Sequence, residues 1–98
     1  MYIQQLTDFF VAINKDERIG TSHISLYMAL FEFWNRNHFE NPIAFTRKNL
    51  MDVSKISAIS TYHKVIKDLH DLGYIIYVPS FHPANGSKAY LLSLEKHF

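Results

Sequence analysis

Residues 46–94 set the architecture of this chain, and they read TRKNLMDVSKISAISTYHKVIKDLHDLGYIIYVPSFHPANGSKAYLLSL. Thr46 can cap a short first helix, after which a tight turn follows. Ser57 can cap a second helix, and Gly73 closes it at a position that favours a left-handed backbone. Residues 46–72 therefore predict two helices joined by a turn. The side chains expected to face inward from the first helix and the turn are Leu50, Met51, Val53 and Ile56.

Residues 74–94 predict a small antiparallel β wing. Residues 74–78 are β-branched and aromatic, and residues 88–94 form the returning strand. Asn85-Gly86 is a strong signal for a tight turn between the two strands. The polar loop over residues 79–88 is expected to project from the sheet. The side chains expected to share one face of the returning strand are Tyr90, Leu92 and Leu94.

Two further helices are expected before this segment. Residues 1–17 carry apolar side chains at helical spacing, which predicts an amphipathic helix. Residues 21–38, capped by Thr21 or Ser22, predict a core helix whose apolar arc is wide enough for two partners. One partner is the segment that follows, and the other is the first helix of this chain or of a second subunit. The residues expected to form a dimer contact are Tyr2, Leu6, Phe9, Phe10 and Ile13.

The composition narrows the class of protein. The chain has 98 residues, with eight Phe, six Tyr, one Trp and no cysteine. So many aromatic residues exceed the needs of a small core, which again favours a homodimer. The absence of cysteine excludes disulfides and thiolate zinc sites and suits a reducing compartment. With no signal sequence and no apolar run long enough to span a bilayer, we expect one cytoplasmic domain over residues 1–98 and no membrane partner.

The formal net charge is only +1, but the charges are unevenly distributed. Residues 1–45 carry three cations and five anions, whereas residues 46–71 carry five cations and three anions. Positive charge therefore collects on the two helices of the central segment. That is where contacts with phosphate groups would need it.

The expected helix over residues 57–72 separates an apolar arc from a polar one at about 100° per residue. Short hydroxyls and flexible cations near the start of a helix suit base edges and phosphates. Asp68 and Asp71 share the polar side and would be repelled by phosphate, so the N-terminal half is expected to make the contact. The alternative is an ordinary solvated helix face. The expected recognition residues are Ser57, Ser60, Thr61, His63, Lys64 and Lys67.

Contacts with the DNA backbone are expected on both sides of this helix. Arg47 and Lys48 open the preceding helix, whose backbone N–H groups could also bind a phosphate. Lys88 ends the wing and could grip the backbone beyond the groove. A purely solvated role is the alternative for each of these three cations.

Metal binding and catalysis are not expected. His63 and His70 lie two helical turns apart, about 10 Å along the axis, and no cysteine or carboxylate completes a compact ligand set. The chain has no glycine-rich phosphate cradle, nucleophile elbow or metal-hydrolase pair. We therefore expect a protein that is not an enzyme and needs no cofactor.

Two runs of the sequence resemble a known family. Residues 24–35 (ISLYMALFEFWN) and 64–75 (KVIKDLHDLGYI) are similar to the N-terminal winged-helix domain of phage replisome-organiser and DnaD-like proteins. They also resemble winged-helix regulators of mobile elements. The resemblance covers about residues 21–94. It implies oligomerisation and DNA binding during replication initiation, with a separate C-terminal helical domain in that family.

The expected fold is α+β and mostly helical. It is a winged helix-turn-helix with a three-helix core, an N-terminal amphipathic helix and a small antiparallel β wing, preceded by a short strand at residues 43–45. The chain ends at Phe98, soon after the last expected strand, which favours a compact regulator over a replication initiator.

The expected function is sequence-specific binding of double-stranded DNA by a small transcriptional regulator. Residues 57–72 would enter the major groove, and the wing over residues 79–88 would lie on the backbone. Two alternatives stay open. One is a replication-initiation or mobile-element accessory protein of DnaD-like type, and the other is a winged helix that binds only protein partners.

Overall fold

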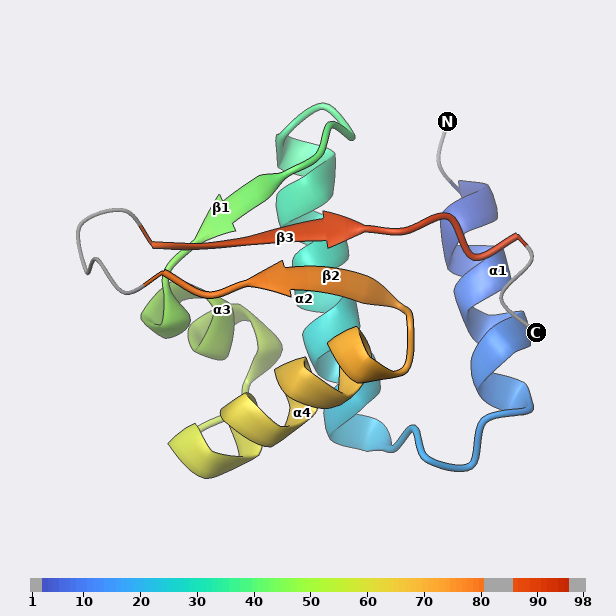
Figure 1. Cartoon of the computed structure of the whole chain (residues 1–98), viewed down its shortest axis with the longest axis horizontal. Coiled ribbons are helices and arrows are strands. Elements are labelled where there is room, and N and C mark those ends of the chain that lie inside the picture. The colour runs from blue at the N-terminus through green and yellow to red at the C-terminus, as the bar shows by residue number, and fades with distance from the viewer. Residues whose placement is uncertain (1–2, 81–85, 96–98) are drawn as a thin grey trace.

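The described residues, 3–80 and 86–95 of this computed structural model, form an α+β fold of four helices and one three-stranded antiparallel sheet (Figure 1). This confirms the expected fold class, and the arrangement is compatible with a winged helix. The helices are α1 (Ile3–Asn14), α2 (Thr21–Arg36), α3 (Arg47–Ser54) and α4 (Ile59–Asp71). The strands are β1 (Ile43–Phe45), β2 (Ile75–Val78) and β3 (Ser87–Leu91).

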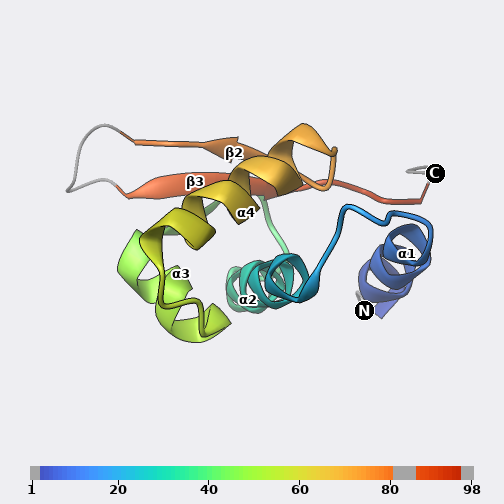
Figure 2. The ribbon, with the colours of Figure 1, turned by 90° about the horizontal axis from the view of Figure 1, so that it is seen from below.

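Helix α2 is the centre of the molecule. It contacts α3, α4 and the sheet, and Figure 2 shows the sheet on one side of α2, α3 and α4. Helix α1 lies beyond α2, near the C-terminal end of the described chain. The wide apolar arc of α2 is therefore covered from several directions, although Met28, expected within it, is exposed. The buried apolar residues of α2 are Leu26, Tyr27, Ala29, Leu30 and Trp34.

The sheet has the strand order β1-β3-β2, and both pairs are antiparallel. The Asn41 side chain extends the β1–β3 pairing, since it donates to the carbonyl of Leu91 and accepts from the N–H of Leu91, each at 3.0 Å. Ala89 and Leu91 are buried, whereas Tyr90 between them is exposed. The expectation that Tyr90 shares a face with Leu94 was therefore wrong, because β3 ends at Leu91 and Leu94 is buried beyond it.

The helix starts and ends are partly as expected. The N–H of Asn49 donates to the Thr46 hydroxyl at 3.1 Å, which confirms the cap of α3, and Gly73 has a φ of 88°, which confirms the left-handed residue after α4. Ser57 does not cap α4, because that helix begins two residues later, after Ala58. The capping position of α2 belongs to Gly20, so the expected cap by Thr21 or Ser22 was also wrong.

Aromatic and polar side chains of α1 hold this helix against the rest of the chain. Phe9 is fully buried and stacks on Tyr27, with ring centroids 3.8 Å apart. The Gln5 amide donates to the Tyr27 hydroxyl at 2.7 Å and to the carbonyl of Leu92 at 2.8 Å. Burial raises the pKa of Tyr27 to about 12. Phe9, expected at a subunit interface, is thus enclosed within one chain, whereas Phe10 is 46% exposed.

Candidate nucleic-acid interface

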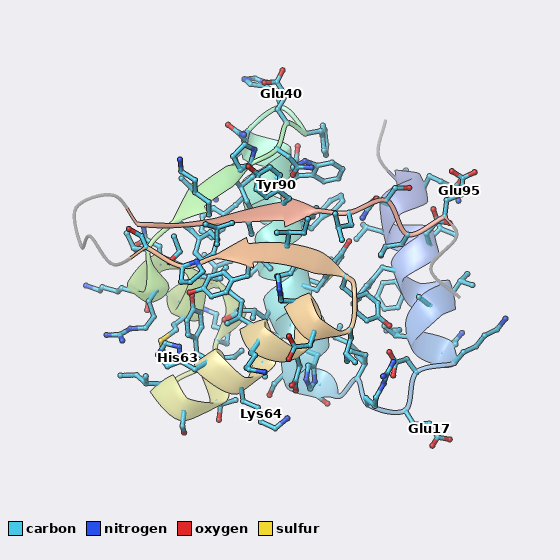
Figure 3. All side chains as sticks on the ribbon, in the orientation of Figure 1. Glu17, Glu40, His63, Lys64, Tyr90 and Glu95 are labelled. Carbon is cyan, nitrogen blue, oxygen red and sulfur yellow. The ribbon has the colours of Figure 1, made fainter. Side chains whose placement is uncertain are left out.

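The outer side of α4 carries most of the residues expected to contact DNA. Ser57 lies just before the helix and is exposed, as are Ser60 and His63 in its first turns. Lys64 and Lys67 are exposed farther along, and Figure 3 shows Lys64 projecting from the helix on the side away from the sheet. Thr61 is only half-buried, on the edge of this surface. The buried side chains on the opposite face are Tyr62, Val65, Ile66 and Leu69.

Both α4 lysines pair with carboxylates of their own helix. The Lys64 ammonium lies 2.7 Å from Asp68, and the Lys67 ammonium lies 2.6 Å from Asp71. Such exposed pairs, one turn apart, are weak because water and salt screen them. The lysines can therefore exchange these carboxylates for phosphate oxygens, although part of their charge is offset in the free protein.

Asp68 does not simply share the outer side with Asp71, as the helical wheel suggested. Its carboxylate lies 2.8 Å from Nε2 of His23, a buried residue in the first turn of α2. The hydrogen bonds from Lys64 and then from His23 lower the pKa of Asp68. Asp68 therefore points along the flank of α4 toward α2, and only Asp71 remains as an acidic residue facing outward from this part of the helix.

The hydrogen bonds of His23 indicate which of its two ring nitrogens carries the proton. Its Nδ1 accepts a hydrogen bond from the N–H of Gly20 at 3.0 Å, so Nδ1 carries no proton in this arrangement. Nε2 therefore holds the proton and donates it to Asp68. The His23 ring therefore hydrogen-bonds both to Gly20, at the N-terminus of α2, and to Asp68 of α4. The contact holds the orientation of α4 relative to the rest of the core.

An open groove of about 490 Å³ runs between α3 and the start of α4. It brings together three of the expected site residues, Arg47, Lys48 and Ser57. A smaller depression of about 230 Å³ joins Ser57 to Thr61 across the connection between the helices. The remaining residues of the larger groove are Met51, Asp52, Ile56 and Ile59.

Lys88 lies apart from these groups. It alternates along β3 with the buried Ala89, so its side chain faces the exposed side of the sheet, as does that of Tyr90. Helices α2, α3 and α4 lie on the other side of the sheet (Figure 2). The structure therefore does not bring Lys88 next to the exposed residues of α4. Half of the expected wing, residues 81–85, lies outside the described residues, as does Tyr2 of the expected dimer contact.

Two features of this surface were missed in the sequence. Val53 and Ile59 were assigned to the core or its edge, yet they are 41% and 48% exposed. Periodicity places a residue around the axis of its own helix, but it does not say whether a neighbouring element covers it. The pairing of His23 with Asp68 was likewise missed, because these residues are 45 positions apart.

No family model, no curated protein and no solved structure matches this chain. Among the described residues, no group of three or more histidines and carboxylates could hold a metal ion. None of the described helices is both long and apolar enough to cross a membrane.

Proposed function

We propose that this protein binds double-stranded DNA as a winged helix-turn-helix, in the role of a small transcriptional regulator. The N-terminal half of α4 enters the major groove, and α3 approaches the adjacent backbone. The observation that carries the proposal is the groove between these helices. It sets Arg47 and Lys48 beside Ser57, at the end of α4 where Ser60 and His63 are exposed.

The chemistry of this surface divides into two parts. Cations at the start of α3 and along α4 attract phosphate oxygens, and this attraction does not depend on base sequence. The hydroxyls of Ser57 and Ser60 and the ring of His63 can donate to or accept from base edges, which differ from pair to pair in the major groove. Cations and base-reading groups on one exposed surface support sequence-dependent binding.

The affinity of one subunit is expected to be modest. Lys64 and Lys67 must release Asp68 and Asp71 before they can pair fully with phosphates. A homodimer would present two such surfaces to one duplex and raise the overall affinity through effective concentration.

The test is a titration of labelled duplexes, selected from a random pool, over a series of salt concentrations. For wild-type protein, log affinity should fall linearly with log salt, by about 0.9 per phosphate contact. Lys67→Ala should weaken binding to all duplexes and lower that slope by about 1. Ser60→Ala should instead change the preferred sequence and leave the slope unaltered.

Arg36→Ala is the matched control, because Arg36 is an exposed cation paired with Glu32 at the far end of α2. It should leave both affinity and slope unchanged. Equally weak binding to every duplex, without salt dependence, would rule the proposal out.

A second candidate is a winged helix that binds only protein partners. It is favoured by the exposed apolar residues on the side of the sheet that no described helix covers, where Ile76 of β2 lies opposite Tyr90 of β3 and Val78 follows on the same side. Ile76→Lys distinguishes the two candidates. It should leave DNA binding intact under the first candidate and abolish capture of the partner under the second.

A further inference from the structure

Ile59 is an exposed apolar side chain at the first position of α4. It belongs neither to the buried core nor to the half-buried residues packed against that core. Among the large apolar residues described as exposed, only Ile3 of α1 is more exposed. The side chain therefore does little for the folded core.

The surroundings of Ile59 point to a ligand of mixed chemistry. It lines the groove between α3 and α4 together with Arg47 and Lys48, so an apolar contact lies beside two cations. His63 follows Ile59 by one helical turn, which places the two exposed side chains on the same side of α4. A partner that fits here has negative charge on its rim and an apolar group within reach of the helix start.

Duplex DNA offers this combination in its major groove. The phosphates line the groove, and the C5-methyl group of thymine is the apolar group that projects into it. We propose that Ile59 contacts the C5-methyl group of a thymine, and so makes the protein prefer thymine at one position of its DNA site. This inference rests on the proposed DNA binding and adds a specificity-determining residue to it.

Asp52 limits where a phosphate can bind in this groove. This exposed carboxylate lines the same groove, where it would repel a phosphate. Phosphate contacts in this groove are therefore expected at Arg47 and Lys48 and not at Asp52. Ser57 and Ile59 carry no charge, so they remain available to a base edge.

The test removes a single methyl group from the DNA. Each thymine of the selected duplex is replaced in turn by deoxyuridine, which differs only by lacking the C5-methyl group. Wild-type protein should lose affinity about fourfold at one position, in line with the burial of one methyl group. Ile59→Ala should bind the original duplex about as weakly as wild type binds the substituted one, and should show no further loss at that position.

Val53→Ala is the matched control. Val53 is a similarly exposed apolar residue, but it does not line the groove. This variant should keep the full sensitivity to deoxyuridine, and helix content measured by circular dichroism should be unchanged in both variants.

The possible outcomes distinguish a failure of the thymine contact from a failure of DNA binding as a whole. The inference is overturned if the selected site lacks thymine, or if Ile59→Ala and wild type lose equal affinity at every substituted position. In either case sequence-dependent binding of the duplex still stands. If the wild-type protein binds no duplex at all, the proposed function itself fails and the contact with thymine fails with it.

Discussion

Asp16 shows how one carboxylate can hold distant segments together. It accepts a hydrogen bond from the Arg18 guanidinium at 2.7 Å and one from the Tyr74 hydroxyl at 2.9 Å. The bond from Arg18 and then that from Tyr74 lower the pKa of Asp16 to about 2, although burial acts in the opposite direction. Burial, followed by the bond to Asp16, raises the pKa of Tyr74. The connection between α1 and α2 is thereby tied to the residue that precedes β2.

Replacing Asp16 with Asn should make the free energy of unfolding less dependent on pH in the acidic range. The pKa of Asp16 in the folded state lies below its usual value of 3.8, so its stabilising effect is complete above about pH 4. That effect is lost as the pH falls toward 2. Asp16→Asn should cost about 1 kcal/mol near neutral pH and flatten the loss of stability between about pH 4 and pH 2.

Urea unfolding at several pH values measures this effect. Glu17→Gln is the control, since it removes one negative charge from the next, exposed residue. An identical pH profile for Asp16→Asn and wild type would show that the bonds to Arg18 and Tyr74 do not stabilise the fold.

At the scale of elements, the sheet depends on a close approach between the start of β3 and the end of β1. Gly86 has a φ of 65°, and a Cβ atom added there would lie 2.8 Å from the carbonyl oxygen of Phe45. The next residue, Ser87, pairs with Phe45. A glycine is therefore needed for two independent reasons, the left-handed backbone and the neighbouring carbonyl.

Gly86→Ala should destabilise the protein by more than about 1 kcal/mol, because the new Cβ is strained by the backbone and also meets a fixed backbone atom. Thermal unfolding followed by circular dichroism is the measurement. Gly20→Ala is the comparison, since a Cβ at that position meets no atom closer than 3.8 Å. Equal losses for the two variants would contradict the proposed role of the β1–β3 approach.

At the scale of the whole molecule, α1 has one side toward the core and one side outward. Phe9 and Ala12 are buried, whereas Ile3, Phe10 and Val11 are exposed. The inner side is accounted for by the stacking of Phe9 on Tyr27. Any pairing of subunits through α1 would therefore use Phe10 and its exposed neighbours.

If two subunits pair through α1, Phe10→Asp should separate them into monomers without unfolding the chain. A charge on the outer side of α1 would be buried in the dimer and free in the monomer, so the monomer is favoured. Sedimentation over a range of protein concentrations measures the change, with Thr21→Asp as a charge control on an exposed polar residue outside α1. Phe9→Asp should instead unfold the chain, because it places a charge in the core.

A wild-type protein that sediments as a monomer at every concentration would contradict pairing through α1. So would a Phe10→Asp variant that keeps the mass of two chains. Because pairing raises the overall affinity, a monomeric Phe10→Asp variant should bind duplex DNA more weakly than the paired wild-type protein.

Local patterns were enough to predict much of this fold. Thr46 as a cap, Gly73 as a left-handed terminator and residues 43–45 as a strand are all confirmed. The exposed character of Ser60, Lys64 and Lys67 is confirmed as well. These features depend on residues within a turn or two of one another, so the printed sequence contains the interactions that produce them.

The remaining features depended on packing between distant parts of the chain. The burial of Phe9 requires Tyr27 and Tyr74, and the direction of Asp68 requires His23. Ile59 is exposed because none of the described elements covers the start of α4. Helical periodicity orders side chains around one axis, but the neighbour that covers a given side is chosen by the packing of all the elements together. For that reason the sequence predicted the elements and their polar faces, whereas the groove, the fastening of α1 and the exposed Ile59 emerged only once the helices and the sheet were packed.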